Sequence, residues 1–159
     1  MKIITTTDCS SEPDLSRLPR SVRPRHYDLS LDVDLDRDDE GTYAGSVSIR
    51  VDVLHRVETI WINSKRCEIS KASYVSEDDE SRPTTRFLAT TVSVRKREEC
   101  VGLLFDEPIP RGRGSLEIEF NGRISKNHEG FYSVPFTDKN GSKRHGAATL
   151  FAATEARSC

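Results

Sequence analysis

Residues 27–35 alternate strictly between apolar and polar side chains, and this pattern restricts the fold more than any other feature of the chain. The apolar positions are Tyr27, Leu29, Leu31, Val33 and Leu35, with Asp28, Ser30, Asp32 and Asp34 between them. Successive side chains of a β-strand point to opposite faces of the sheet, so the pattern predicts a strand with one buried face and one face in water. Pro19 and Pro24 precede the pattern and disfavour a helix, which predicts an extended lead-in.

Further segments with a period of two or a β-rich composition follow along the chain. They are residues 47–53, 60–62, 69–75, 87–94, 101–105, 116–120, 130–132 and 147–151. No segment has the 3.6-residue period of an amphipathic helix. Short strands separated by turn residues predict an all-β fold, either a curved saddle of antiparallel or mixed strands or a β-sandwich.

Turn-forming residues are expected to separate these strands. The expected loops are residues 36–41, 76–86, 110–114 and 138–142. The strand over 101–105 is expected to end at Asp106, where another acidic residue and Pro108 follow. The pair Asn121-Gly122 has two interpretations: a hairpin turn, or extended chain that continues to Ile124.

The length and composition favour one globular domain. Residues 1–16 are polar and without period, so we expect a flexible tail there and a single domain over 17–159. The 24 basic and 26 acidic residues nearly balance, which disfavours a nucleic-acid partner. No apolar stretch is long enough for a membrane helix, and the first residues do not resemble a secretory signal. We therefore expect no membrane segment and a cytoplasmic location.

The sequence predicts no catalytic or metal-binding residues in this chain. His128-Glu129-Gly130-Phe131-Tyr132 begins like the H-E-x-x-H motif of zinc peptidases but has Tyr132 where the second ligand should be. The other histidines show no ligand spacing, and neither a G-x-S-x-G elbow nor a phosphate-binding glycine loop is present. The four cysteines form no C-x-x-C pair, and we expect Cys67 and Cys100 to be core thiols.

Several segments, in the same order, resemble the amino-terminal domain of the gluzincin aminopeptidases, the family of aminopeptidase N and puromycin-sensitive aminopeptidase. They are Leu18-Pro19 with Val22, Pro24 and His26 to Leu29, then Gly45 to Ile49, Ile60 to Asn63, Leu116 to Ile124, Gly130 to Tyr132, and Ala148 to Arg157. The resemblance spans about residues 17–159. It implies a β-rich saddle that packs on a thermolysin-like catalytic domain.

The same resemblance implies where the chemistry of such an enzyme lies. The zinc ion, the H-E-x-x-H helix and the G-A-M-E-N loop belong to the catalytic domain, downstream of this chain. The implied partners are therefore the catalytic domain and, through the full-length enzyme, peptide substrates. This chain itself is expected to hold no cofactor.

One substrate-binding feature of the family falls within this domain. In the family, a Gln and a Glu lie in the segment between the Thr and the Ala-Arg pair of the motif. These two residues help to bind the free amino terminus of the substrate. The matching positions here are Leu150 and Ala152, whose side chains accept no hydrogen bond. Glu155 stands where the family has Asp, and we expect it to cap the chain or pair with Arg157.

Two functions follow as hypotheses. The first is an accessory domain of a zinc aminopeptidase, which removes amino-terminal residues from peptides only as the full-length enzyme and is catalytically silent alone. The alternative is a free-standing, degenerate β-sandwich module that binds a peptide or a protein. The replacements at Leu150 and Ala152 lean slightly towards degeneracy.

Overall fold

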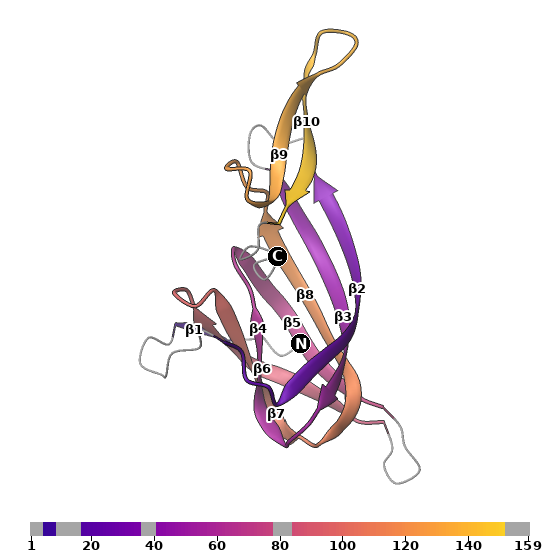
Figure 1. The fold of residues 1–159 in the computed structure, drawn as a ribbon, viewed down its shortest axis with the longest axis vertical. Coiled ribbons are helices and arrows are strands. Elements are labelled where there is room, and N and C mark those ends of the chain that lie inside the picture. Colours follow the sequence, from indigo (N-terminus) through magenta and orange to yellow (C-terminus); the bar gives the residue numbers. More distant parts are fainter. Residues whose placement is uncertain (1–4, 9–16, 36–40, 78–83, 152–159) are drawn as a thin grey trace.

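The computed structural model describes residues 5–8, 17–35, 41–77 and 84–151, and these residues form ten β-strands and no helix (Figure 1). The strands are β1 (Thr5–Asp8), β2 (Val22–Asp34), β3 (Thr42–Val53), β4 (Val57–Asn63), β5 (Cys67–Ser76), β6 (Arg86–Arg95), β7 (Cys100–Ile109), β8 (Gly112–Arg123), β9 (Gly130–Thr137) and β10 (Lys143–Leu150). The all-β prediction is confirmed.

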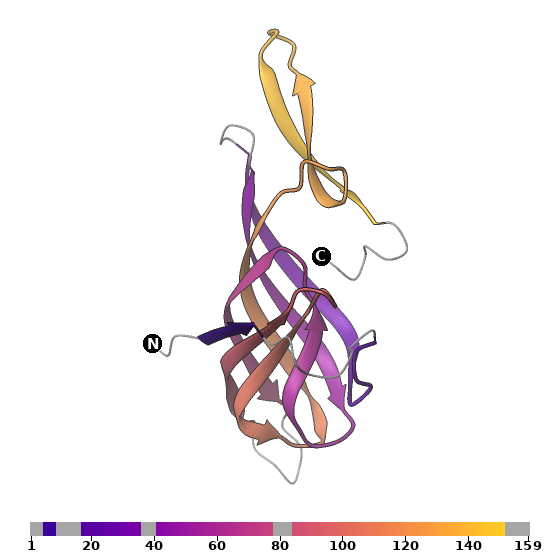
Figure 2. The same ribbon diagram turned by 90° about the vertical axis from the view of Figure 1, so that its left-hand side faces the viewer.

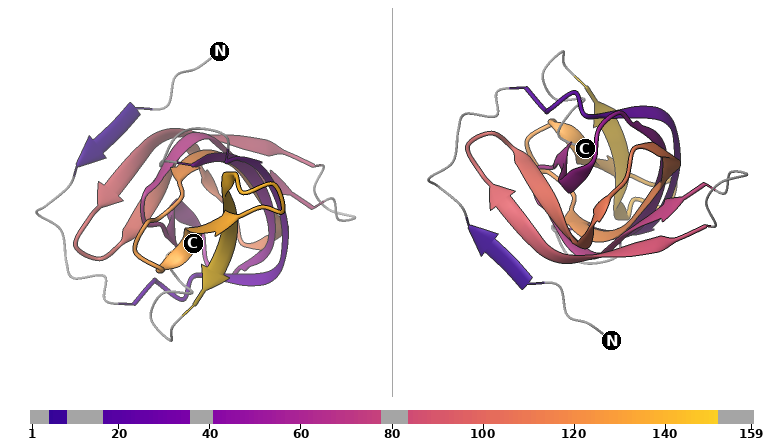
Figure 3. Two further views of the ribbon diagram at one scale, coloured as in Figure 1. Left: turned by 90° about the horizontal axis from the view of Figure 1, so that it is seen from above. Right: turned by 90° about the horizontal axis from the view of Figure 1, so that it is seen from below.

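Eight strands form one strongly curled sheet (Figure 3). Its order is β2-β3-β8-β5-β6-β7-β4, all antiparallel, and β1 pairs in parallel with β6. Strand β6 pairs with β5 only through its first residues, 86–88, and with β7 from Ala89 onward. It therefore passes from one layer to the other, so that the two halves of the sheet face each other, as expected for a curved sheet that approaches a sandwich.

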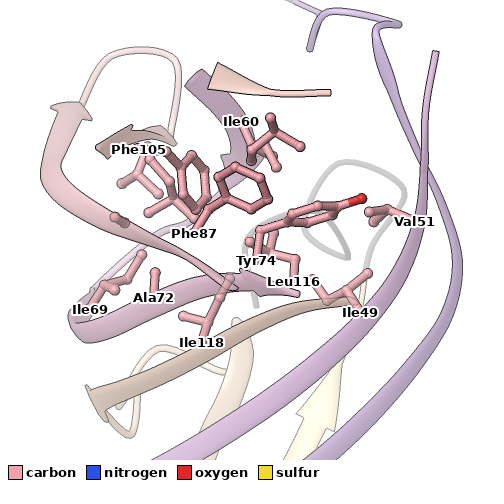
Figure 4. Packing of buried hydrophobic residues seen from close by; sticks show 14 of the residues in the cluster. Ile49, Val51, Ile60, Ile69, Ala72, Tyr74, Phe87, Phe105, Leu116 and Ile118 are labelled. Carbon is pink, nitrogen blue, oxygen red and sulfur yellow. The ribbon is translucent and has the colours of Figure 1, made fainter. Parts of the chain in front are cut away.

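Apolar side chains of both layers fill the space inside the curl (Figure 4). Tyr74 on β5 is 1% exposed and tilts against Phe87 on β6, with 6.0 Å between the ring centroids. Leu103 and Ile109 on β7 are fully buried. Burial raises the pKa of the Tyr74 hydroxyl to about 12, with a smaller contribution from Glu77.

The alternating pattern of β3 and β8 gives the burial that it predicts. Val51 and Val53 on β3 and Leu116 and Ile118 on β8 are buried, whereas the residues between them are more exposed. Asn121-Gly122 lies within β8, which confirms the extended interpretation and excludes the hairpin turn.

The expected end of β7 is wrong. The strand continues through Asp106 and Pro108 to Ile109. Pairing between β4 and β7 skips residues 105–108, so Pro108 needs no hydrogen bond to β4, and the Asp106 carboxylate accepts hydrogen bonds from the backbone N–H groups of Leu88 and Glu107. The loop expected over 110–114 is correspondingly short, because β8 already begins at Gly112.

The strand expected over 27–35 is present in β2, but its predicted burial is wrong. Tyr27, Leu29 and Leu31 are 59%, 56% and 41% exposed. Strand β2 is the outermost strand beside β3 and lies beyond the part of the sheet that β6, β7 and β4 cover. Its apolar face is therefore aligned with the core without being enclosed by it.

Strands β9 and β10 form a separate hairpin that projects beyond the end of β8 (Figure 2). Its turn is the one expected over 138–142: the Asp138 carboxylate accepts hydrogen bonds from the N–H groups of Asn140 and Ser142 at 2.8 and 2.9 Å. At its base, Ser125 bridges to Tyr132. Within residues 1–16, the structure describes only β1, whose backbone pairs with residues 91–94.

Candidate functional site

The apolar side chains of β2 form an exposed strip on the inner face of the curled sheet. Residues paired across neighbouring strands lie on the same face. The pairing places Tyr27 beside Ile49 and Leu116, Leu29 beside Val47 and Ile118, and Leu31 beside Gly45 and Phe120. We call Tyr27, Leu29 and Leu31 the inner-face strip; it continues the core surface outward to the edge of the sheet.

Gly45 leaves space for the aromatic ring of Phe120 on this face. A Cβ atom at Gly45 would be 2.5 Å from Cζ of Phe120 and 2.9 Å from Cδ2 of Leu31. Only a residue without a side chain permits both approaches. Phe120 and Leu31 therefore both lie over Gly45, and Phe120 continues the apolar surface from the inner-face strip towards the core.

Tyr43 extends the same apolar surface to the root of the hairpin. Its ring packs edge-on against Phe120 and Phe131, with centroid distances of 6.2 and 5.4 Å. Its hydroxyl lies 3.3 Å from Sγ of Cys67. Because a Cβ at Gly122 would collide with the Tyr43 ring, Gly122 provides the space that this ring occupies.

The predicted core thiols differ in their burial. Cys100 is 1% exposed, as expected, whereas Cys67 is half-buried, and both are free. Desolvation raises the pKa of both thiols; the Tyr43 hydroxyl partly offsets this at Cys67, and Arg95 partly offsets it at Cys100. Neither thiol is thereby activated as a nucleophile.

The opposite face of the sheet carries ion pairs. Arg86 donates to a carboxylate oxygen of Glu117 at 2.6 Å, and Ser73 donates to the same oxygen at 3.2 Å. Lys71 pairs with Glu119 at 2.8 Å. The hydrogen bond from Arg86 is the main cause of a lowered pKa at Glu117. This face is thus suited to water, in contrast to the inner face.

The position expected to face a substrate lies at the end of β10. Leu150 pairs with Gly130 at the base of the hairpin and is 53% exposed, and the following Phe151 is 50% exposed. Ala152, Glu155 and Arg157 lie outside the described residues. The end of β10 therefore presents apolar side chains and no hydrogen-bonding side chain at position 150.

His128 and Glu129 occupy the bend before β9. His128 has a left-handed backbone, with φ of 55°, and its ring packs at a tilt against the ring of Tyr132, with 5.0 Å between the ring centroids. Glu129 pairs with Arg66 at 3.7 Å. In the part of the chain that the structure describes, no three His, Cys, Asp or Glu side chains are grouped as a metal site requires.

Comparison with known protein families identifies the domain. Residues 23–159 match the Peptidase M1 N-terminal domain. The chain belongs to this family. The M1 peptidases are zinc peptidases. In this chain, the inner-face strip, the hairpin and Leu150 all lie within the matched M1 amino-terminal domain.

Curated relatives of this M1 domain are much longer. Aminopeptidase M1 of Arabidopsis thaliana is 32% identical over 143 residues, which are 90% of this chain and 16% of that protein. Aminopeptidase M1-C of Oryza sativa subsp. japonica is 32% identical over 144 residues, and Endoplasmic reticulum aminopeptidase 1 of Rattus norvegicus is 30% identical over 142 residues. The chain spans about one sixth of the length of these relatives.

The sequence predicts the role of Tyr43 and the exposure of the inner-face strip only in part. Tyr43 was not expected as the link between sheet and hairpin, although the series Tyr43, Gly45, Val47 and Ile49 extends the alternation of β3 towards it. The exposed state of the inner-face strip was not expected either.

Across the described ranges, the structure has no helix that could span a bilayer.

Proposed function

We propose that this M1 domain is the amino-terminal scaffold of a zinc aminopeptidase and packs against the catalytic domain through the inner-face strip. The observation that carries the proposal is the exposure of Tyr27, Leu29 and Leu31 on a face whose neighbouring part is core. Enclosing each half-exposed side chain contributes about 1 kcal/mol, half of the usual value for full burial. A partner that covers the strip would complete the fold.

In this arrangement the domain contributes no zinc ligand. The described residues form no cluster that fits a zinc ion, so no step of peptide hydrolysis is assigned to them. Zinc, held by the catalytic domain, would supply the activated water of a metallopeptidase. The domain's part is to fix the position of its hairpin beside the substrate.

The end of β10 is proposed to lie near the amino terminus of the peptide substrate. Leu150 and Ala152 take the positions of the family's Gln and Glu, and neither can accept a hydrogen bond from an ammonium group. An acidic side chain beside the ammonium would favour its charged form. We therefore expect weak recognition of free amino termini by an enzyme built on this domain.

The test begins with the isolated chain. We expect no turnover of an aminoacyl-coumarin substrate, with or without added zinc, and measured turnover that copurifies with the chain would overturn the scaffold proposal. The second step replaces the matching region of Aminopeptidase M1 of Arabidopsis thaliana by this chain. In that chimera, Leu150→Gln with Ala152→Glu should raise kcat/KM at least about tenfold, equivalent to one charge-assisted hydrogen bond. An unchanged kcat/KM would contradict a role of positions 150 and 152 in substrate binding.

A further inference from the structure

In the part of the chain that the structure describes, the outer edge of β2 is open from Arg23 to Asp32. Strand β2 pairs with β3 on one side, and among the described residues no strand pairs with its other side (Figure 1). Every residue from Arg23 to Asp32 is exposed. An open edge presents unpaired backbone N–H and C=O groups, which can pair with a strand of another chain.

We propose that a second copy of this chain pairs antiparallel with β2 through a two-fold axis at Leu29, which joins the two sheets into one. This interaction goes beyond the proposed scaffold function, because it uses the backbone edge of β2 and not a catalytic domain. Homodimers with two-fold symmetry are the commonest protein assemblies, and a self-complementary strand is what such symmetry requires.

The charges of β2 favour an antiparallel second copy over a parallel one. The first part of the strand carries Arg23, Arg25 and His26. On the neighbouring strand β3, Arg50 lies opposite His26 in the ladder. The last part carries aspartates at positions 28, 32 and 34. In an antiparallel pair His26 of each copy lies beside Asp32 of the other, and this attraction occurs twice, whereas a parallel pair would align the acidic ends of the two strands.

The side chains also select one register. With the axis at Leu29, the opposed pairs are Leu29 with Leu29, Tyr27 with Leu31, Asp28 with Ser30, and His26 with Asp32. Apolar residues then meet on the inner face, and a histidine donor meets a carboxylate on the outer face. A shift of the axis by one residue either way places aspartate opposite aspartate, at Asp28 with Asp28 or at Asp28 with Asp32.

The backbone limits the paired segment to the residues after the bulge. The pairing of β2 with β3 shifts between Pro24 and His26, and Arg25 forms an ion pair with Asp52. Pro24 has no N–H group to donate, which is tolerated at the edge of a sheet. The proposed contact from His26 to Asp32 lies wholly beyond this interruption.

Analytical ultracentrifugation of the 159-residue chain over a range of concentrations tests the pairing. We expect the mass to rise from 17.9 kDa towards twice that value. Leu29→Lys should raise the dimer dissociation constant at least about tenfold, because two lysines would face each other at the axis. Leu104→Lys, at an exposed leucine on β7, is the matched control and should leave it unchanged.

A charge swap separates the edge contact from the inner-face strip. His26 lies on the opposite face from the strip, so His26→Glu should weaken the dimer by repulsion from Asp32 of the second copy and leave docking to a catalytic domain intact. Adding Asp32→Lys should restore the dimer. Failure of the scaffold proposal would leave these results unchanged, so the two proposals can fail separately.

Cysteine cross-linking tests the register directly. Cα atoms opposed across an antiparallel pair are about 4.5 or 5.5 Å apart, within the range of a disulfide. In a background with Cys9→Ser and Cys159→Ser, Leu29→Cys should form a disulfide-linked dimer on mild oxidation. Leu31→Cys should not, because its Cα atoms would be roughly 14 Å apart.

Four results would overturn the proposal. The first is a mass that stays at 17.9 kDa at every concentration, and the second is a dimer dissociation constant that Leu29→Lys leaves unchanged. The third is failure of Asp32→Lys to restore the dimer in the His26→Glu protein. The fourth is equal disulfide cross-linking of Leu29→Cys and Leu31→Cys.

Discussion

Gly114→Ala should destabilise the domain by about 1 to 2 kcal/mol, although alanine is ordinarily the better residue in a strand. Gly114 is buried on β8, and a Cβ atom there would meet the Cζ and hydroxyl oxygen of Tyr74 and lie 2.5 Å from the backbone oxygen of Val75. Tyr74 is 1% exposed and the Val75 oxygen belongs to the sheet, so neither can easily move. Overpacking costs roughly 1 to 3 kcal/mol, and relief of glycine's backbone entropy offsets roughly 0.5 to 1 kcal/mol of it.

Urea unfolding followed by tryptophan fluorescence measures this cost. Trp61 is the only tryptophan, and the Arg95 guanidinium lies 4.6 Å from the centre of its ring, so its emission reports on folded packing. The midpoint should fall without a change in slope. Adding Tyr74→Phe removes one of the colliding atoms and should recover part of the loss. A Gly114→Ala protein as stable as the parent, or a double variant without recovery, would refute the packing argument.

Two further predictions concern the hairpin and the outer face. Tyr43→Ala removes the ring that contacts Phe131, so hydrogen exchange should speed up across β9 and β10 and change little in β7; equal effects in both places would contradict the anchoring role of Tyr43. Glu117 has a lowered pKa in the folded state, so its contribution to stability is present above the unfolded pKa and is lost as the pH falls through the folded value. Glu117→Gln should therefore reduce the loss of stability on acidification below about pH 4.5, and identical pH profiles for the two proteins would argue against the Arg86 pairing.

The alternation of residues predicts strands well because it is a local property. In β3 and β8 it also predicts the buried face, since these strands lie under the covering layer. In β2 the same pattern identifies the apolar face and fails on its burial. What covers a face depends on where β6 crosses between the layers, and no local pattern contains that information.

The remaining differences have similar causes. Asp106 and Pro108 have the composition of a turn, yet the chain stays extended because the Asp106 side chain satisfies the N–H of Leu88 and the proline lies where β4 does not pair. Gly122 looks like part of a hairpin turn, but its lack of a side chain serves the Tyr43 ring. In each case a partner distant in sequence decides the role of the residue.

The candidate site was predictable to a different degree in each part. Leu150 was found through the resemblance to a family motif, and the structure adds that it is exposed at the end of β10. The apolar path from the inner-face strip to the hairpin, through Phe120 and Tyr43, depends on contacts between β3, β8 and β9 that become visible only in three dimensions.

The most direct test of the scaffold proposal is the affinity of this chain for the catalytic part of Aminopeptidase M1 of Arabidopsis thaliana, prepared without its own amino-terminal region. Calorimetric titration should show binding, and serine at Tyr27, Leu29 and Leu31 together should weaken it at least about tenfold. Serine at the exposed Leu104 should have no effect. Binding by the triple variant as tight as that of the parent would contradict the proposal that the inner-face strip docks the catalytic domain.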